Sequence, residues 1–527
     1  MKRIYYLAAF ALLGEVAANA QNYGDALRYS TEELGGTARF RGMSGAFGAL
    51  GGDPSAININ PAGSAVYNGS EISFSLNNNA QKRDITFLGT KSSNKQNDFD
   101  LNQFSVNFVI PTGQSVVNKI TFAFNYNQMK NFDVDKFTYL GNSNKGVEDY
   151  FLHYAKEGNG GAPFQLGYIA PARVYNAKPT DRFYQEDIGE NYASLRGANA
   201  RTAFLGVITS LVEPGTVTPT NTVYTSNGGG ANRDHKYEVE RDGFVNKYNY
   251  NFGMQLGDMV YLGTNLNHHS INEKVLYSLR DDNYDTISKI TYANHQQIVE
   301  TNGNGFSFQV GAIVKPTEDL RLGVTYQSPT WYDMKEQSRE MLFTTVGGTK
   351  RDIELRNYYG DPIWLERKYK FRTPSAWTGS AAYIIAKRAI VSVDYTYKAY
   401  DNLTFRSSNM RDENQIIQND LGDTSTLRIG GEFRVPFKMG GATNYWSFRA
   451  GYRYEQSPYR KEIAPVGDLT AYSGGIGVTL GGVRLDASYD VAKQTNTFQM
   501  YENVLTDKAE IKSTQGNFLF TFTARLF

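Results

Sequence analysis

Apolar and polar residues alternate along most of the chain from about residue 70 onward. In the segment 483–491, every second residue is apolar or aromatic, and the residues between them are polar or charged. The same pattern recurs in 247–256, 389–398, 427–434 and 446–455. A period of two is that of a β-strand with one apolar face. The pattern therefore predicts strands with one apolar and one charged face.

About fourteen such strands are predicted along the chain. Many are long enough to cross a bilayer at a tilt, which takes about 9–11 residues, whereas strands of soluble proteins usually have about five or six. The predicted strands are 69–90, 101–110, 119–128, 244–256, 259–279, 296–314, 320–335, 365–385, 389–407, 424–436, 446–458, 470–480, 483–498 and 512–527. The first segment is also compatible with two strands.

The connections between these strands alternate between short and long. Short connections are 257–258, 315–319, 386–388 and 481–482, and long ones are 129–243, 280–295, 336–364, 408–423 and 499–511. Outer-membrane barrels combine short periplasmic turns with long extracellular loops. We therefore predict an all-β fold, a transmembrane antiparallel β-barrel. The large insertion 129–243 is expected outside the cell, as a cap over the barrel mouth or as a solvated loop.

Composition supports the barrel and excludes several other classes. Aromatic residues make up 14% of the chain, and there are 51 Gly but no Cys. The lack of Cys excludes disulfides, thiolate metal sites and a Cys nucleophile. With only five His, we expect no metal centre and no cofactor. The 54 Lys and Arg against 53 Asp and Glu give a net charge of +1, so nothing indicates nucleic-acid binding.

The first twenty residues have the pattern of a secretory signal peptide. Lys2 and Arg3 precede a short apolar run from Ile4 to Leu13, and Ala18-Asn19-Ala20 is a small-x-small site. This predicts cleavage between Ala20 and Gln21 and export of the mature chain. The alternative, an N-terminal anchor helix, is disfavoured because the apolar run is too short to span a bilayer comfortably.

The last strand ends in an aromatic residue, Phe527. Such an ending is similar to the signal that the barrel-assembly machinery reads, so this machinery is an expected partner. The apolar face of the strand is out of step with Phe527, and this leaves its register open. That face consists of Phe518, Phe520, Phe522 and Leu526.

The segment 21–68 does not alternate and is rich in small residues. Met43, Phe47 and Leu50 have the spacing of one helical face, and Asp53-Pro54 and Asn60-Pro61 are turn signals. A compact segment before the first strand predicts a plug inside the barrel. The expected division is therefore a signal peptide over 1–20, a plug over 21–68 and a barrel over 69–527.

Three motifs stand out in this segment: Arg41 to Phe47, Asp53 to Ala56 and Asn60 to Gly63. They resemble the hatch of the FadL/TodX family, outer-membrane transporters of long-chain fatty acids and other hydrophobic compounds. Barrel segments that are similar to the family are 326–329, 373–377, 427–432 and 449–452. The insertion 129–243 does not match.

The resemblance implies a hatch that blocks the lumen, an apolar ligand pocket, and release sideways through a gap in the barrel wall. It assigns hatch or gating roles to Arg41, Gly42, Gly45, Asp53, Asn60, Pro61, Ala62 and Gly63. Met43, Phe47 and Leu50 are candidates for lining the ligand route. For all of these residues the alternative is structural packing.

The inward faces of the C-terminal strands carry charged residues: Arg428, Glu432, Arg434, Arg449, Arg453 and Glu455. A ladder of anion-binding groups is one interpretation. Ion pairs that brace the lumen are the favoured one.

The sequence thus predicts a monomeric transporter that contacts outer-membrane lipid and hydrophobic small molecules, fatty acids or hydrocarbons. A diffusion porin and a docking or shuttle component of a protein secretion system remain alternatives. An outer-membrane hydrolase needs Ser and His held together. His268 and His269 are adjacent in sequence and have no Ser-centred motif beside them, so no enzyme is expected.

Overall fold

The computed structural model describes residues 20–113, 116–158, 160–178, 180–181, 184–439, 442–460, 465–499, 501 and 504–526. The signal segment before Ala20 and the terminal Phe527 lie outside the described residues. Cleavage before Gln21 and a C-terminal assembly signal therefore stay predictions.

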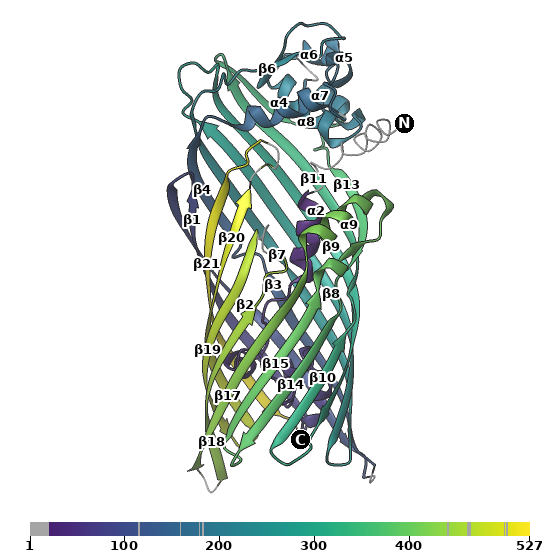
Figure 1. The fold of residues 1–527 in the computed structure, drawn as a ribbon, viewed down its shortest axis with the longest axis vertical. Helices are drawn as coiled ribbons and strands as arrows, with labels where there is room; N and C mark the ends of the chain where they lie inside the picture. Colours follow the sequence, from purple (N-terminus) through teal and green to yellow (C-terminus); the bar gives the residue numbers. More distant parts are fainter. Residues whose placement is uncertain are drawn as a thin grey trace, which may run out of the picture.

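The chain forms a closed antiparallel barrel of fourteen strands (Figure 1). It closes because β1 pairs with both β2 and β21. The all-β barrel and its strand number are confirmed. The strands are β1 (Glu71–Phe87), β2 (Thr90–Pro111), β3 (Val117–Asn131), β7 (Arg233–Leu256), β8 (Val260–Asp282), β9 (Ile290–Val314), β10 (Leu320–Gln327) continued by β11 (Trp331–Val346), β13 (Leu365–Arg372) continued by β14 (Ala376–Ile385), β15 (Ala389–Ala399), β17 (Asp423–Met439), β18 (Ala442–Glu455), β19 (Val466–Leu480), β20 (Val483–Gln499) and β21 (Lys508–Arg525).

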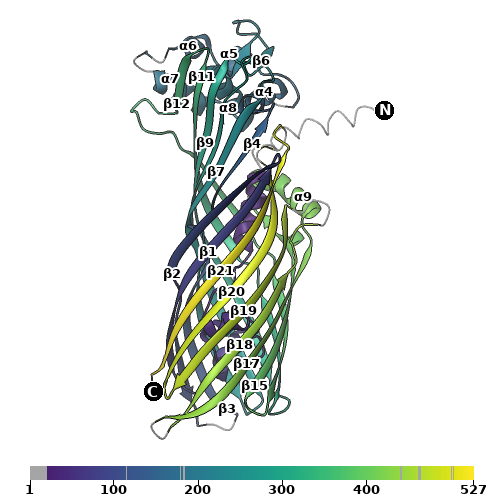
Figure 2. The same ribbon diagram turned by 90° about the vertical axis from the view of Figure 1, so that its left-hand side faces the viewer.

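The two ends of the barrel differ as predicted. One end, here the turn end, carries short connections, and the other, the loop end, carries the long ones (Figures 1 and 2). One connection breaks the expected alternation. At the loop end β1 and β2 are joined by the tight turn Leu88-Gly89, because β2 begins at Thr90 rather than near residue 101.

Two neighbouring strands predicted as continuous are interrupted at the same level. The breaks lie at 328–330 and 373–375, and each contains a proline, which has no N–H to donate to the sheet. Thr330 N donates to Thr373 Oγ1 at 2.8 Å, and Thr373 N donates to Thr330 O at 3.0 Å. These bonds hold the two interrupted strands together.

The barrel wall is apolar outside and polar inside, the reverse of a soluble protein. Large apolar side chains exposed on its outer face include Phe74, Phe122, Tyr250, Leu266, Phe306, Val324, Trp377, Tyr395, Phe433, Phe448, Tyr472, Tyr489 and Phe518. Among the described helices none is long and apolar enough to cross a membrane.

The insertion after β3 forms a helical cap at the loop end (Figure 2). The core of the cap contains the fully buried Phe151, Phe204 and Leu205. The elements of the cap are β4 (Lys136–Ser143), α4 (Val147–Glu157), α5 (Leu166–Ile169), α6 (Ala172–Tyr175), α7 (Tyr184–Ser194), α8 (Ala198–Ile208), β5 (Val212–Pro214) and β6 (Tyr224–Ser226).

Shorter segments complete the loop end. β4 pairs with β7, and β12 pairs with β11. Between β15 and β17, the short strand β16 pairs with β13, and α9 follows it. The bounds are β12 (Thr349–Glu354), η4 (Tyr400–Asn402), β16 (Thr404–Phe405), η5 (Ser408–Met410) and α9 (Arg411–Asp420).

The N-terminal segment lies inside the barrel (Figure 1), consistent with a plug. Its helix α2 is near the loop end, and its three other helices lie lower in the lumen. The elements are α2 (Ala20–Ser30), α3 (Ala38–Gly42), η2 (Pro54–Asn58) and η3 (Pro61–Val66). The helical face expected over 43–50 is not formed, because α3 ends at Gly42 and Met43 is its C-cap.

Buried ion pairs fasten α3 to the wall. Glu432 binds Arg39 at 3.0 Å and Arg449 at 2.6 Å. Arg449 also binds Asp486 at 2.7 Å, and Arg41 binds Asp490 at 2.7 Å. The ion-pair interpretation of the inward charged rows is confirmed for Glu432, Arg434 and Arg449, with two hatch arginines as additional members. Arg453 pairs with Glu455 at 3.4 Å, whereas Arg428 forms no ion pair within the described residues.

We expect Glu432→Ala to destabilise the hatch strongly. The substitution leaves Arg39 and Arg449 buried without their shared carboxylate, a loss of about 3–5 kcal/mol for a buried pair. Thermal unfolding in detergent and protease cleavage of the hatch measure the effect. The matched control is Glu318→Ala at an exposed position in the turn between β9 and β10. Equal stability of the two variants would show that the network does not hold the hatch.

Candidate functional site

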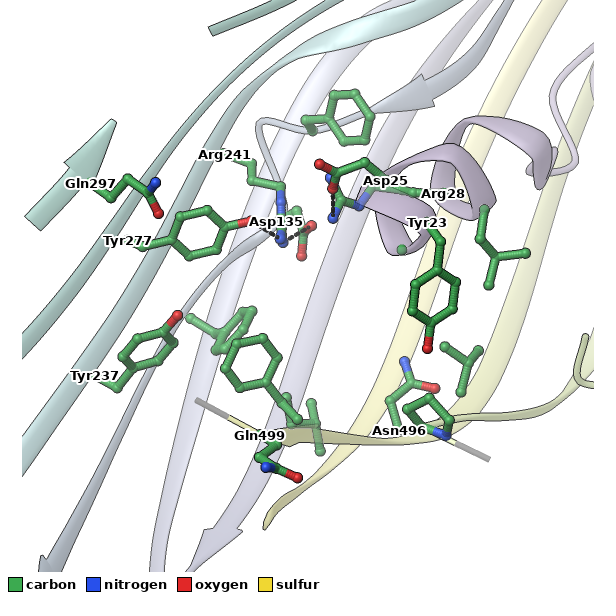
Figure 3. Close-up of a pocket in the computed structure, with 18 of the residues that line it drawn as sticks. Tyr23, Asp25, Arg28, Asp135, Tyr237, Arg241, Tyr277, Gln297, Asn496 and Gln499 are labelled. Carbon is green, nitrogen blue, oxygen red and sulfur yellow. Dashed lines mark hydrogen bonds and ion pairs between the residues drawn. The ribbon is translucent and has the colours of Figure 1, made fainter. Parts of the chain in front are cut away.

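A cavity of about 1120 Å³ is lined by residues of α2 and of the cap. Figure 3 shows side chains of α2, β7 and β8 that line it. Residues Tyr23, Asp25 and Arg28 of α2 form its floor. Strands β7, β8 and β20 contribute side walls. The roof contains Tyr150 and Tyr154 from α4. The volume is at the upper end of small-molecule sites, which span roughly 300–1,000 Å³.

The floor of the cavity is formed by basic and acidic side chains that pair with one another. Arg28 binds Asp25 at 2.7 Å, and Asp135 binds Arg83 and Arg241, each at 2.7 Å (Figure 3). Burial raises the pKa of Asp25 to about 6, although Arg28 is next to it. The floor therefore gains a negative charge as the pH rises through this value.

The upper part of the cavity is aromatic. The rings of Tyr150 and Tyr501 stack with centroids 3.9 Å apart, and the Tyr501 hydroxyl pairs with His295 Nδ1 at 2.8 Å. Tyr192 donates its hydroxyl to Glu340 at 2.6 Å. The hydroxyl groups of Tyr501 and Tyr192 are thus hydrogen-bonded to neighbouring side chains, while the faces of the rings offer apolar surface. A ligand with an apolar body and a polar head matches this division.

The barrel wall is incomplete beside the cavity. β2 pairs with β3 only up to Gln103 and Asn127, although β2 continues to Thr90 and β3 to Asn131. The register of each strand shifts at this level, at Asn102 in β2 and at Met129 in β3. We call this interruption the β2–β3 window.

Side chains bridge the window at two levels. Asn131 Nδ2 donates to Asp98 at 2.6 Å and to Asp100 at 2.8 Å. Higher up, Asn94 exchanges hydrogen bonds with the backbone of Thr138. Asn131 also lines the cavity, so the cavity reaches the window.

The hatch covers the window from inside. Gly36 N donates to Asn102 Oδ1 at 2.8 Å. Gly36 has a φ of +115°, which favours glycine. At Gly35 an added Cβ would lie 2.7 Å from the side chain of Asn127. Two consecutive glycines therefore let the hatch backbone seat against the edge of the window.

Asn60, singled out from the sequence, joins the hatch to the wall. Its Nδ2 donates to Gly48 O at 2.8 Å and to Ala312 O of β9 at 3.1 Å, and its Oδ1 accepts from Ala62 N. Pro61 occupies the first turn of η3. Gly63 lies against Gly51 within the hatch. All these contacts are buried packing contacts.

The other predicted hatch residues have similar surroundings. Asp53 accepts hydrogen bonds from Thr37 Oγ1 at 2.8 Å and from Ser55 N at 3.0 Å. Gly42 packs on Gly475 of β19, and Gly45 has a φ of +76°. The candidate ligand-lining residues Met43, Phe47 and Leu50 are buried in a small apolar cluster with Phe40 and Ala56, and none of the three lines the cavity.

Wall glycines that face the hatch were missed by sequence reasoning. A Cβ at Gly263 would lie 2.4 Å from the Pro61 backbone, and one at Gly451 would lie 2.5 Å from the Met43 backbone. Gly430 is equally close to Met43. Glycine at inward positions of a strand is the signal that could have identified them. Sequence reasoning also missed the residues that line the cavity, because the strands that carry them come together only in the folded protein.

The sequence profile of the outer membrane protein transport protein family (OMPP1/FadL/TodX) matches residues 233–526. The chain belongs to this family. The match begins at Arg233 and therefore leaves out the hatch and residues 129–232 of the insertion. It makes the barrel an outer-membrane protein of a family that transports hydrophobic compounds. A search of curated proteins finds no match.

Solved structures of FadL/TodX proteins share the fold. A FadL homologue from Pseudomonas aeruginosa is 14% identical with a TM-score of 0.53, covering 94% of this chain and 100% of that one. The P. putida toluene transporter TodX is 12% identical with a TM-score of 0.48, covering 94% and 99%. A mutant of the TodX monoaromatic hydrocarbon channel is 10% identical with a TM-score of 0.50, covering 93% and 99%.

The cavity floor of this FadL/TodX-family barrel predicts a pH effect on binding of anionic ligands. Asp25 is mostly neutral below its raised pKa and ionised above it. Raising the pH from about 5 to about 7 is therefore expected to weaken binding of a fluorescent alkylsulfonate about two- to fivefold. The sulfonate keeps its charge over this range. Titration of the protein in neutral detergent measures the change.

Asp25→Asn is the matched control, because it keeps the shape and removes the titration. Its affinity is expected to stay constant over the same pH range. An equal pH dependence in both proteins would assign the effect to another group.

Proposed function

We propose that the protein takes up amphipathic hydrophobic compounds, above all long-chain fatty acids, across the outer membrane. The ligand binds in the cavity beneath the cap and leaves sideways through the β2–β3 window. One observation carries this proposal. The cavity extends to an interruption of the wall, while the hatch below it is fastened by buried ion pairs.

The family and the loop lengths support the proposed orientation. The loop end with its cap, residues 129–243 in the predicted division, faces the outside, and the turn end faces the periplasm. Residues 21–68 act as the hatch, and 69–527 form the barrel. Export by a cleaved signal peptide and assembly through Phe527 belong to the same proposal.

Lateral release suits an acyl chain because it avoids water. Each buried methylene stabilises the bound chain by about 0.8 kcal/mol, and this contribution is kept when the chain moves directly into lipid. The outer lip of the window is apolar. Phe99 is 65% exposed and Leu101 46% exposed on β2, just where its pairing with β3 has ended.

In this mechanism most of the hatch is a fixed wall. Asn60, Pro61, Ala62 and Gly63 hold its lower part against β8 and β9. Arg41 fastens α3 to Asp490 of β20, and Asp53 holds the folded shape of the hatch. Met43, Phe47 and Leu50 serve packing rather than ligand contact. The movable element is the segment around Gly35 and Gly36, which covers the window through few bonds.

The cavity favours a head group over a bare hydrocarbon. The names of the TodX structures assign toluene and monoaromatic hydrocarbons to those proteins. The floor of this cavity contains Arg28, Arg83 and Arg241 with their carboxylate partners. Such a floor offers hydrogen bonds to a carboxylate and nothing to toluene. Its packed lumen also speaks against a diffusion porin for hydrophilic solutes.

A reversible cross-link across the window tests lateral release. Asp98→Cys with Asn131→Cys puts the only two thiols of the chain on opposite sides of the window. A short thiol-reactive cross-linker is expected to lower fatty-acid uptake by whole cells at least about tenfold, and a reductant to restore it. Binding in detergent by the double variant should be the same with and without the cross-linker, because the cross-link closes the exit and not the cavity.

The matched control is Asn272→Cys with Asn302→Cys, a hydrogen-bonded pair at 2.9 Å on neighbouring strands of the intact wall. Its cross-link should leave uptake unchanged. Normal uptake with a sealed β2–β3 window would exclude the proposed route.

A further inference from the structure

The outer face of the barrel carries an excess of cations on three adjacent strands near α9. We call this set the β13 cationic face. Two acids accompany the five cations. The set consists of Lys335, Lys368, Lys370, Arg372, Arg406, Asp333 and Glu366.

Their spacing places them on one surface. Asp333 lies directly opposite Lys370, and Lys335 directly opposite Lys368. Arg372 belongs to the same side of β13 by the period of two. Arg406 N donates to Lys370 O at 2.8 Å, which places this arginine beside Lys370 on the neighbouring strand.

The charges of this face are not balanced within the protein. Lys370 binds Asp333 at 3.0 Å, but Lys335 and Lys368 share Glu366 at 3.0 and 3.2 Å. Like charges directly opposite each other in a sheet are destabilising. In the part of the chain that the structure describes, Arg372 and Arg406 form no ion pair.

The face lies where lipid head groups lie. Trp331 is opposite Arg372 at its lower edge, and below it the outer wall is apolar through Val324, Leu322 and Trp377. Aromatic residues mark the membrane interface of such barrels. Lys335 is four positions beyond Trp331, roughly 10 Å higher for a tilted strand.

A second site at a comparable level lacks the excess. On the outer face of β8 and β9, Lys274 lies opposite Glu300 and binds it at 2.9 Å. At that site one cation is balanced by one acid. The surplus of the β13 cationic face therefore does not extend to this pair on β8 and β9.

We propose that the β13 cationic face binds the phosphorylated head group of a lipid in the outer leaflet. A phosphate monoester carries about −1.5 to −2 charges and several strong acceptors. Placed between Lys335 and Lys368, it replaces their repulsion with attraction, while Arg372 and Arg406 offer planar two-pronged donors. The acyl chains of the same lipid lie on the apolar wall below.

Binding of diphosphoryl lipid A to the protein in neutral detergent tests this proposal. We expect the triple variant with Lys335→Ala, Lys368→Ala and Lys370→Ala to bind this lipid about tenfold more weakly or worse. The reason is that each Lys or Arg side chain near an anionic lipid contributes to the free energy of binding. Lys274→Ala should bind as the unchanged protein does. Glu366→Gln removes an acid from the face and should strengthen binding. Heat-dependent gel migration verifies that each barrel is folded.

Two further probes identify the recognised chemistry. Lipid A without its phosphates should bind to the unchanged protein as weakly as diphosphoryl lipid A binds to the triple variant. Inorganic phosphate at the same concentration as the lipid should not compete for binding. The proposal is overturned if the triple variant binds normally, if Lys274→Ala loses as much, or if the dephosphorylated lipid binds equally well.

Discussion

The buried ion network between α3 and the wall is the constraint on which the rest of the structure depends. Arg39 and Arg41 are taken out of water and reach Glu432 and Asp490 inside the barrel. Buried charges are tolerated only when they are paired with good geometry, and removal of one partner is costly. A hatch held in this way blocks the axis of the lumen, so a ligand needs another way out.

The wall is adapted to that fixed hatch. Inward glycines such as Gly263 and Gly451 let the hatch backbone touch the strands, where any side chain would collide. Two features lie above the fixed part of the hatch: the cavity above α2, and the β2–β3 window, which the segment around Gly35 and Gly36 covers from inside. In the proposed function, binding and lateral release are therefore consequences of one packing arrangement.

Much of the fold was predictable because the membrane imposes a period of two on every spanning strand. The hatch was predictable as a segment that lacks this period. Its contacts were not, because Arg39 and Glu432 are far apart in sequence and no local pattern pairs them. The helical face predicted for Met43, Phe47 and Leu50 is not formed, because the chain turns after α3 at Gly45, which has a positive φ.

The window and the cavity could not be derived from the sequence. The window arises from register shifts at Asn102 and Met129. A shift by one residue hardly changes the sequence of apolar and polar residues in a strand that is mostly polar. The cavity combines α2, the cap and several strands that meet only in three dimensions. The breaks at Pro329 and Pro374 had a visible signal, since proline cannot continue a paired strand.

A disulfide between hatch and wall tests the central claim most directly. Gly42 and Gly475 lie so close that a Cβ on Gly42 would be 3.4 Å from Gly475 Cα, and the chain has no other cysteine. Gly42→Cys with Gly475→Cys should therefore lock α3 to β19 under oxidising conditions. Uptake of fatty acid is predicted to remain normal in the locked protein, because the ligand passes the hatch sideways. Loss of uptake that a reductant restores would contradict the account and show that the lower hatch must move.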